Sequence, residues 1–164
     1  MENPKELYIT MGKKSVKENK NMYYEFREKM GYTREQAAEK MGFISASRIE
    51  KIDNEKSLAH PEEVLEMSKC YEAPEMCNLY CAHECPIGKE TIPEIEVKDI
   101  TKLTLEMLVS LNSLEQDKNR LMEIAVDGVI SEDEIEDFEK IRHKLAEISM
   151  AIDSLDLWTK KNIE

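Results

Sequence analysis

The sequence of 164 residues has few residues that break or bend helices, since Gly and Pro number 5 each, and aromatic residues make up 6%. No apolar run approaches the roughly 18 residues of a membrane span, and the opening MENPKELYIT holds no apolar core of signal-peptide length. Leu, Ile, Met, Glu and Lys are plentiful, and 41% of the residues are apolar. We therefore expect an all-α, globular, cytoplasmic protein with no membrane partner.

The patterns that mark common enzymes are also missing. The sequence holds no Gly-rich phosphate-binding loop. The three histidines, His60, His83 and His143, stand in unrelated settings with no Ser and acid arrangement for hydrolysis. We expect no enzymatic activity and no small-molecule substrate.

The charge is uneven along the chain. The formal net charge at pH 7 is −12, which argues against DNA as a partner because duplex binding relies on Lys and Arg to neutralise phosphates. Residues 1–60, however, hold 12 Lys and Arg against 10 Asp and Glu, whereas residues 61–164 hold 11 against 25. The acidity therefore belongs to the second part, and the first part remains suited to a nucleic acid.

Helical signals divide the chain into three segments: a basic N-terminal arm over 1–20, a domain of short helices over 21–90 and a helical hairpin over 91–164. The middle segment alternates short apolar helical patterns with Gly and Pro stops, which predicts five short helices. Pro61 suits the first turn of the fourth, and the fifth is predicted over 74–85.

Two short helices stand in tandem near the start of this domain. Thr33 begins a capping-box pattern, so a helix is predicted over 34–41. Gly42 closes that helix, and Ser45 can cap a second one that turns Ile49 inward. The pattern predicts two helices joined by a tight turn.

The segment TREQAAEKMGFISASRIEKIDN closely resembles the helix-turn-helix of the Xre-type regulators, the group that includes lambda repressor and Cro. The likeness continues through PEEVLEMSKCYEAP, which is similar to the family's fourth helix. The stretch from Gly42 to Ile49 is one residue longer than usual, and Asp53 stands where the family often has Glu. The match rests on a helix-opening Thr, a small residue between helices, a turn Gly and an anchoring Ile: Thr33, Ala38, Gly42 and Ile49.

This resemblance implies a lambda-repressor-like five-helix DNA-binding domain and a sequence-specific transcriptional regulator that binds an inverted-repeat operator as a dimer. Arg48 is the best candidate for reading a guanine, because a guanidinium can donate to O6 and N7 together. Arg34, Lys51 and the basic arm are expected to hold phosphates, with a solvated surface charge as the alternative for each Lys. The expected DNA contacts are Arg34, Ser45, Ala46, Ser47, Arg48 and Lys51.

Four cysteines lie close together in the chain: Cys70, Cys77, Cys81 and Cys85. The last three repeat every fourth residue, a spacing that puts Cβ atoms about 5–6 Å apart on a helix and suits a cluster better than one tetrahedral zinc ion. Cys85 followed by Pro86 also resembles the Cys-Pro ending of bacterial ferredoxin motifs. Three alternatives stay open: free or buried thiols, an iron–sulfur cluster or zinc, and a disulfide formed on oxidation.

Two long helices are predicted after Pro93, over 97–126 and from Ser131 onward. Leu105, Leu108 and Val109 give the first of them an additional apolar edge, so a homodimer through a four-helix interface is expected, with packing inside one chain as the alternative. The second helix carries an uninterrupted apolar heptad seam: Phe138, Ile141, Leu145, Ile148, Ile152 and Leu155.

The acidic half of the chain fits a second class of function. A protein-interaction module or inhibitor could keep the helix-turn-helix scaffold and bind a basic protein surface with its C-terminal half. Reversing the charges near the hairpin turn distinguishes the two classes, because only the interaction module depends on these carboxylates: Glu132, Asp133, Glu136 and Asp137.

Overall fold

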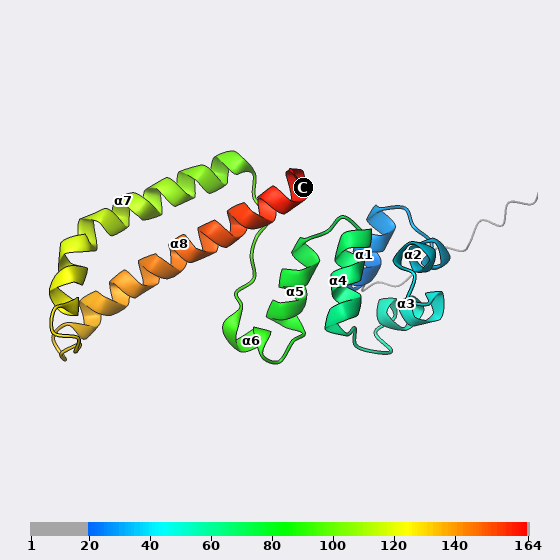
Figure 1. Cartoon of the computed structure of the whole chain (residues 1–164), viewed down its shortest axis with the longest axis horizontal. Helices are drawn as coiled ribbons and strands as arrows, with labels where there is room; N and C mark the ends of the chain where they lie inside the picture. Colours follow the sequence, from blue (N-terminus) through cyan, green and yellow to red (C-terminus); the bar gives the residue numbers. More distant parts are fainter. Residues whose placement is uncertain (1–19, 164) are drawn as a thin grey trace, which may run out of the picture.

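The computed structural model describes residues 20–163, and these residues form eight helices and no strands (Figure 1). The protein is all-α, as its composition predicts, whereas the expected arm over 1–20 lies outside the described residues except for Lys20. None of the helices in this part of the chain combines the length and apolar character needed to cross a membrane. The helices are α1 (Met22–Lys29), α2 (Arg34–Met41), α3 (Ala46–Asp53), α4 (Pro61–Cys70), α5 (Glu75–His83), α6 (Gly88–Thr91), α7 (Ile100–Ala125) and α8 (Ile135–Asn162).

Side-chain caps fix where the two tandem helices begin. The Thr33 hydroxyl accepts from the Gln36 N–H, and the Gln36 side chain accepts from the Thr33 N–H at 2.8 Å, so the predicted capping box of α2 is confirmed. The Ser45 hydroxyl accepts from the Arg48 N–H at 3.2 Å, which confirms the predicted cap of α3. One turn of helix, α6, was not predicted, because four residues are too few to show a helical period.

Helices α1 to α5 share one apolar core. Ile49 and Ile52 of α3 are fully buried with Val64 and Met67 of α4 and Met76 of α5. Burying a side chain of this size contributes about 1.5–3 kcal/mol, so the inner face of α3 is held firmly. The opposite face of α3 is left at the surface.

Helices α7 and α8 pack against each other as the predicted antiparallel hairpin (Figure 1). Leu103 of α7 and Ile141 of α8 are among the residues buried between them. Helix α8 begins at Ile135 rather than at Ser131, whose N–H and hydroxyl both bind the Glu134 carboxylate in a preceding turn. The predicted start of this helix was therefore four residues early.

The uninterrupted apolar seam predicted for α8 is wrong. Leu145 and Ile152 are 42% and 48% exposed, and Lys144 turns toward α7 instead, where its ammonium bonds to the Asp117 carboxylate. Because Lys144 faces α7, Leu145 beside it lies off the line of contact between the two helices. An apolar strip of the hairpin is consequently open to solvent.

The hairpin is tied to the short helices at two places. Lys161 near the end of α8 forms an ion pair with Glu75 of α5. Asn78 of α5 donates from Nδ2 to the Pro93 carbonyl at 2.9 Å and accepts the Ile95 N–H at 2.8 Å. These contacts hold the linker and the C-terminal end of α8 beside α5, while the turn of the hairpin projects away (Figure 1).

Candidate nucleic-acid interface

The turn between α2 and α3 brings most of the expected contact residues to one surface. Gly42 closes α2 with φ at 78°, in the left-handed region that favours glycine. Ser45 and Ser47 are exposed, Ala46 is half-buried, and Lys51 is exposed one turn further along α3. The N-terminal turn of α3 therefore faces solvent together with the turn that precedes it.

A buried ionic group fixes the other end of α3. Asp53 accepts from Nη2 of Arg27 at 2.9 Å and from Nε of Arg34 at 2.9 Å, both on the same oxygen, Oδ2. The Arg27 and Asp53 side chains are 4% and 1% exposed. Arg34 uses only Nε in this contact and is partly exposed, so its terminal nitrogens can still reach a phosphate.

Arg48, the residue expected to read a guanine, lies against α4 instead. Its Nε and Nη2 donate to the two oxygens of the Glu63 carboxylate, each at 2.7 Å. Nη2 also donates to the Leu58 carbonyl at 2.8 Å, and Nη1 bonds to the Ser57 hydroxyl. Most of the N–H donors of the guanidinium are thus engaged inside the fold, and this geometry does not fit Arg48 as a base reader.

The pair with Glu63 also changes both ionisations. The hydrogen bond between the side chains raises the pKa of the Arg48 guanidinium and lowers the pKa of the Glu63 carboxyl. Both groups are therefore charged throughout the neutral range. The pair acts as a clamp between α3 and α4, and sequence reasoning missed it because its partners are 15 residues apart.

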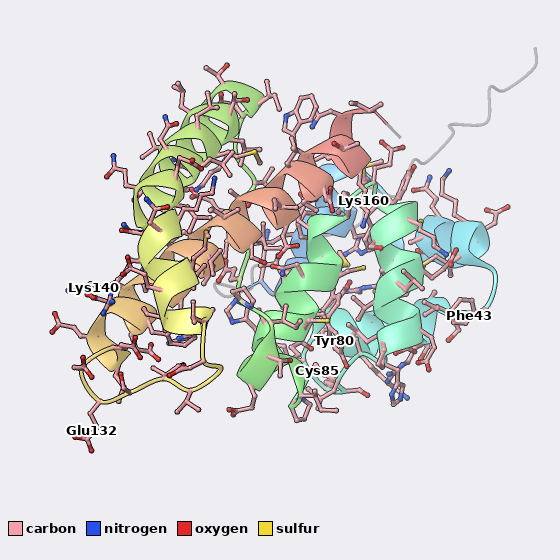
Figure 2. The ribbon with its side chains drawn as sticks, turned by 60° about the vertical axis from the view of Figure 1, so that its left-hand side comes forward. Phe43, Tyr80, Cys85, Glu132, Lys140 and Lys160 are labelled. Carbon is pink, nitrogen blue, oxygen red and sulfur yellow. The ribbon has the colours of Figure 1, made fainter. Side chains whose placement is uncertain are left out.

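Phe43 is the residue of this surface that sequence reasoning missed. It follows Gly42 in the turn before α3 and is 62% exposed (Figure 2). An apolar residue outside every helical period gives no signal in a pattern analysis, because its exposure depends on the turn. An exposed Phe beside a helix N-terminus can contact the methyl group of a thymine.

The charges around α3 are balanced. Lys40 and Lys51 are exposed, and Lys40 also lies over the Tyr32 ring at 5.0 Å from its centroid. Glu39 and Glu50 are exposed on the same two helices. Attraction for phosphates therefore depends on a few individual Lys and Arg side chains rather than on a broad basic patch.

The four cysteines, Cys70, Cys77, Cys81 and Cys85, are all free and partly buried. The Cys77 thiol lies 3.2 Å from the Ser68 hydroxyl, and the thiol of Cys85 accepts the Gly88 N–H at 3.5 Å. Among residues 20–163, no group of three or more Cys, His, Asp or Glu side chains is placed to hold a metal ion. A zinc ion or an iron–sulfur cluster on these cysteines stays a prediction, with no ligand group assembled for it in this part of the chain.

Local packing changes the ionisation of two of these thiols, Cys70 and Cys81. Burial raises the pKa of the Cys70 and Cys81 thiols, and nearby Cys85 and Cys77 raise that of Cys81 further. Gly88 packs directly on α5, because a Cβ at this position would lie 2.1 Å from the Cys81 carbonyl oxygen. The two thiols with raised pKa are therefore protonated at neutral pH.

Comparisons with known proteins give no match: no family model, no curated protein and no solved structure matches this chain. The structure establishes an all-α protein whose short N-terminal helices present the outer face of α3 to solvent. What the protein does is inferred from that surface and from the hairpin.

Proposed function

We propose that this protein is a sequence-specific DNA-binding transcriptional regulator of the Xre type, with a lambda-repressor-like arrangement of its N-terminal helices. The observation that carries the proposal is the exposed N-terminal turn of α3, presented beside the α2–α3 turn while Ile49 and Ile52 anchor the inner face. In helix-turn-helix proteins the second helix enters the major groove in this manner, with its first residues over base edges.

The contacts divide by chemistry. Ser47 and Phe43 are assigned to base edges. The Ser47 hydroxyl would donate or accept a hydrogen bond, and the Phe43 ring would contact a thymine methyl group. Lys51 and the terminal nitrogens of Arg34 are assigned to phosphates. Arg48 contributes indirectly, because its contact with α4 sets the position of α3.

The start of α3 supplies a further attraction for phosphate. Backbone N–H groups at a helix N-terminus point outward and carry partial positive charge, and Ser45 and Ala46 are the residues at this end. Since the side-chain charges nearby are balanced, one copy of the domain should bind DNA weakly and with strong salt dependence. Two linked copies would bind far more tightly, which favours a dimer.

The dimer surface is assigned to one face of the hairpin. The contact between Asp117 and Lys144 sets the register of the two helices, and it places Leu111 level with the stretch between Leu145 and Ile152. All three are large apolar side chains that the chain itself leaves exposed. A second copy would cover them and form a four-helix interface.

This surface differs from the edge expected from the sequence. Leu105 and Val109 lie on the other face of the hairpin, where they line a groove with α8. Leu108 is exposed and does not line that groove. The dimer proposal therefore moves to the strip that contains Leu111.

The proposal is tested by capture of DNA. The purified full chain is mixed with fragments of its host genome at low salt, and retained fragments are sequenced. We expect a small set that shares a short inverted repeat. Retention of no fragment, or of all fragments equally, would refute sequence-specific binding.

A second candidate function rests on the hairpin turn. Val126 is 84% exposed, and Val129 in the turn and Ile135 at the start of α8 are also exposed, as are the carboxylates of Glu132 and Asp133. Figure 2 shows Glu132 projecting at this end of the hairpin. Exposed apolar groups with a charged rim are typical of protein-binding sites. The candidate is a protein-interaction module that binds a basic, partly apolar protein surface with this turn.

Reversing charge at the turn distinguishes the two functions. The variant is Glu132→Lys with Asp133→Lys, because Asp137 bonds to Arg120 and its replacement would disturb the hairpin. Loss of a protein partner with DNA binding intact favours the interaction module. If the variant keeps both protein binding and DNA binding, these carboxylates have no role in either, and DNA binding through α3 remains the proposed function.

A further inference from the structure

A groove lies on the face of the hairpin opposite the assigned dimer surface. The linker over 94–98 crosses beside α7 and α8, and the three segments surround a volume of about 630 Å³. This volume falls within the range of about 300–1,000 Å³ that is usual for small-molecule sites. Its apolar lining comes from all three segments: Ile95, Leu105, Val109, Met150 and Ala151.

The charged groups of the groove are mostly carboxylates. Four glutamates line it: Glu94, Glu96, Glu106 and Glu147. The single cation in the lining, Lys98, is already paired, with its ammonium 2.6 Å from the Glu106 carboxylate and 3.7 Å from that of Glu96. The groove is therefore apolar inside and negative at its rim.

We propose that this groove binds a hydrophobic cation, a small molecule whose aromatic or aliphatic groups surround a positive charge. Leu105 and Val109 are exposed apolar side chains. A ligand that covers them removes apolar surface from water, which stabilises the complex. The Glu147 carboxylate has one basic neighbour among the described residues, the exposed His143 ring at 3.4 Å, and no Lys or Arg within bonding distance, so it is the group assigned to the cationic centre. An anion of the same shape would be repelled.

The linker that forms one wall connects the groove to α5. Asn78 holds both the Pro93 carbonyl and the Ile95 N–H, and the His83 ring lies 2.8 Å from the Glu94 carboxylate. A ligand that packs on Ile95 therefore stabilises the linker against α5. Control of DNA binding through this contact rests on the proposed function, whereas ligand binding itself does not.

Calorimetry with two ions of the same shape and opposite charge tests the site. Tetraphenylphosphonium should bind the full chain at least about tenfold more tightly than tetraphenylborate. Val109→Arg, which puts a cation into the groove, should weaken tetraphenylphosphonium binding by about tenfold or more. Leu108→Arg is the matched control, since it adds the same charge one residue away and outside the groove. Equal binding by both arginine variants would show general attraction to an acidic protein and overturn the site.

Two further measurements make the result decisive. Tetraphenylphosphonium should slow hydrogen exchange at the Ile95 N–H in the wild type and not in Val109→Arg. Unchanged exchange in the wild type would contradict the claim that the ligand stabilises the linker against α5. Light scattering of Val109→Arg tests whether a second copy of the chain fills the groove instead. A dimeric wild type that binds no cation, together with a monomeric Val109→Arg, would show that the groove is a dimer interface and overturn the ligand site. If the chain binds tetraphenylphosphonium but retains no fragment in the DNA-capture experiment, the regulator proposal is refuted and the ligand site remains.

Discussion

Arg27 on α1 and Asp53 at the end of α3 form a buried ion pair, with Nη2 of Arg27 2.9 Å from Oδ2 of Asp53. Arg34 of α2 donates to the same oxygen, so one carboxylate joins three helices. Oδ1 of Asp53 is buried with no hydrogen-bond partner among the described residues, which leaves the carboxylate strongly dependent on its two arginines. The C-terminal end of α3 is therefore held to α1 and α2 through this one acidic residue.

Replacing Asp53 should destabilise the N-terminal helices severely. Asp53→Ala removes the buried counter-charge of the Arg27 guanidinium and leaves it only the exposed Glu28 carboxylate at 3.0 Å, which costs about 3–5 kcal/mol of unfolding free energy. Urea unfolding followed by circular dichroism measures the change. The matched control is Arg34→Ala, which removes a partly exposed donor and should cost about 1 kcal/mol. Equal losses for the two variants would contradict the account of the ion pair.

Arg48 and Glu63 should be energetically coupled. Each alanine variant breaks the same two-bond contact, so the double variant should lose less stability than the two single losses added together. The coupling energy from a double-mutant cycle is expected at about 1–3 kcal/mol. Additive losses would show that the contact contributes no coupling energy, and Arg48 would again be a candidate for contact with DNA.

The same pair predicts a pH dependence. The hydrogen bond from Arg48 lowers the pKa of Glu63 in the folded protein, so its stabilisation is fully present above the unfolded pKa of about 4.3 and is lost as the pH falls through the folded pKa. The wild type should be more stable than Glu63→Gln by a constant margin from about pH 6 to 8. That margin should shrink below about pH 4. A margin that does not change with pH would contradict the lowered pKa.

Gly88→Ala should detach α6 from α5. The added Cβ would lie 2.1 Å from the Cys81 carbonyl oxygen, which is backbone and cannot rotate away. Overpacking of this kind costs about 1–3 kcal/mol. We expect faster reaction of Cys81 and Cys85 with a thiol reagent, whereas Thr91→Ala on the same helix should leave the rates unchanged. Unchanged rates in Gly88→Ala would mean that α6 does not protect these thiols.

Leu111→Glu should prevent dimer formation. It puts a charge into the exposed apolar strip assigned to the dimer, and an unpaired charge buried in an interface is strongly unfavourable. Light scattering at micromolar concentration should give a dimer for the wild type and a monomer for Leu111→Glu. Leu108→Glu, at an exposed position outside the strip, should stay dimeric. A monomeric wild type would remove the dimer from the account.

The parts of the fold that the sequence predicted correctly depend on local signals. The capping box at Thr33 and the cap at Ser45 act within one turn of helix, so the residue pattern is enough to place the starts of α2 and α3. The long antiparallel hairpin was also predicted, because its apolar period extends over many residues.

The parts that were missed depend on contacts between distant residues. Arg48 has a promising position for DNA, and only the packing of α4 shows that Glu63 occupies it. The apolar seam of α8 looked continuous because a pattern cannot show that Lys144 turns toward Asp117. The exposure of Phe43 likewise follows from the turn around it, which no periodicity records.

The most direct test of the central claim compares DNA binding by the wild type and by a variant of the outer face of α3. Ser47→Glu places a carboxylate where base edges would lie, and it replaces an exposed side chain that makes no hydrogen bond to the other described residues. Fluorescence anisotropy with the captured DNA should show loss of binding for Ser47→Glu and unchanged binding for Lys89→Glu, an exposed position on α6. Equal binding by the wild type and Ser47→Glu would contradict the role of α3 in DNA recognition.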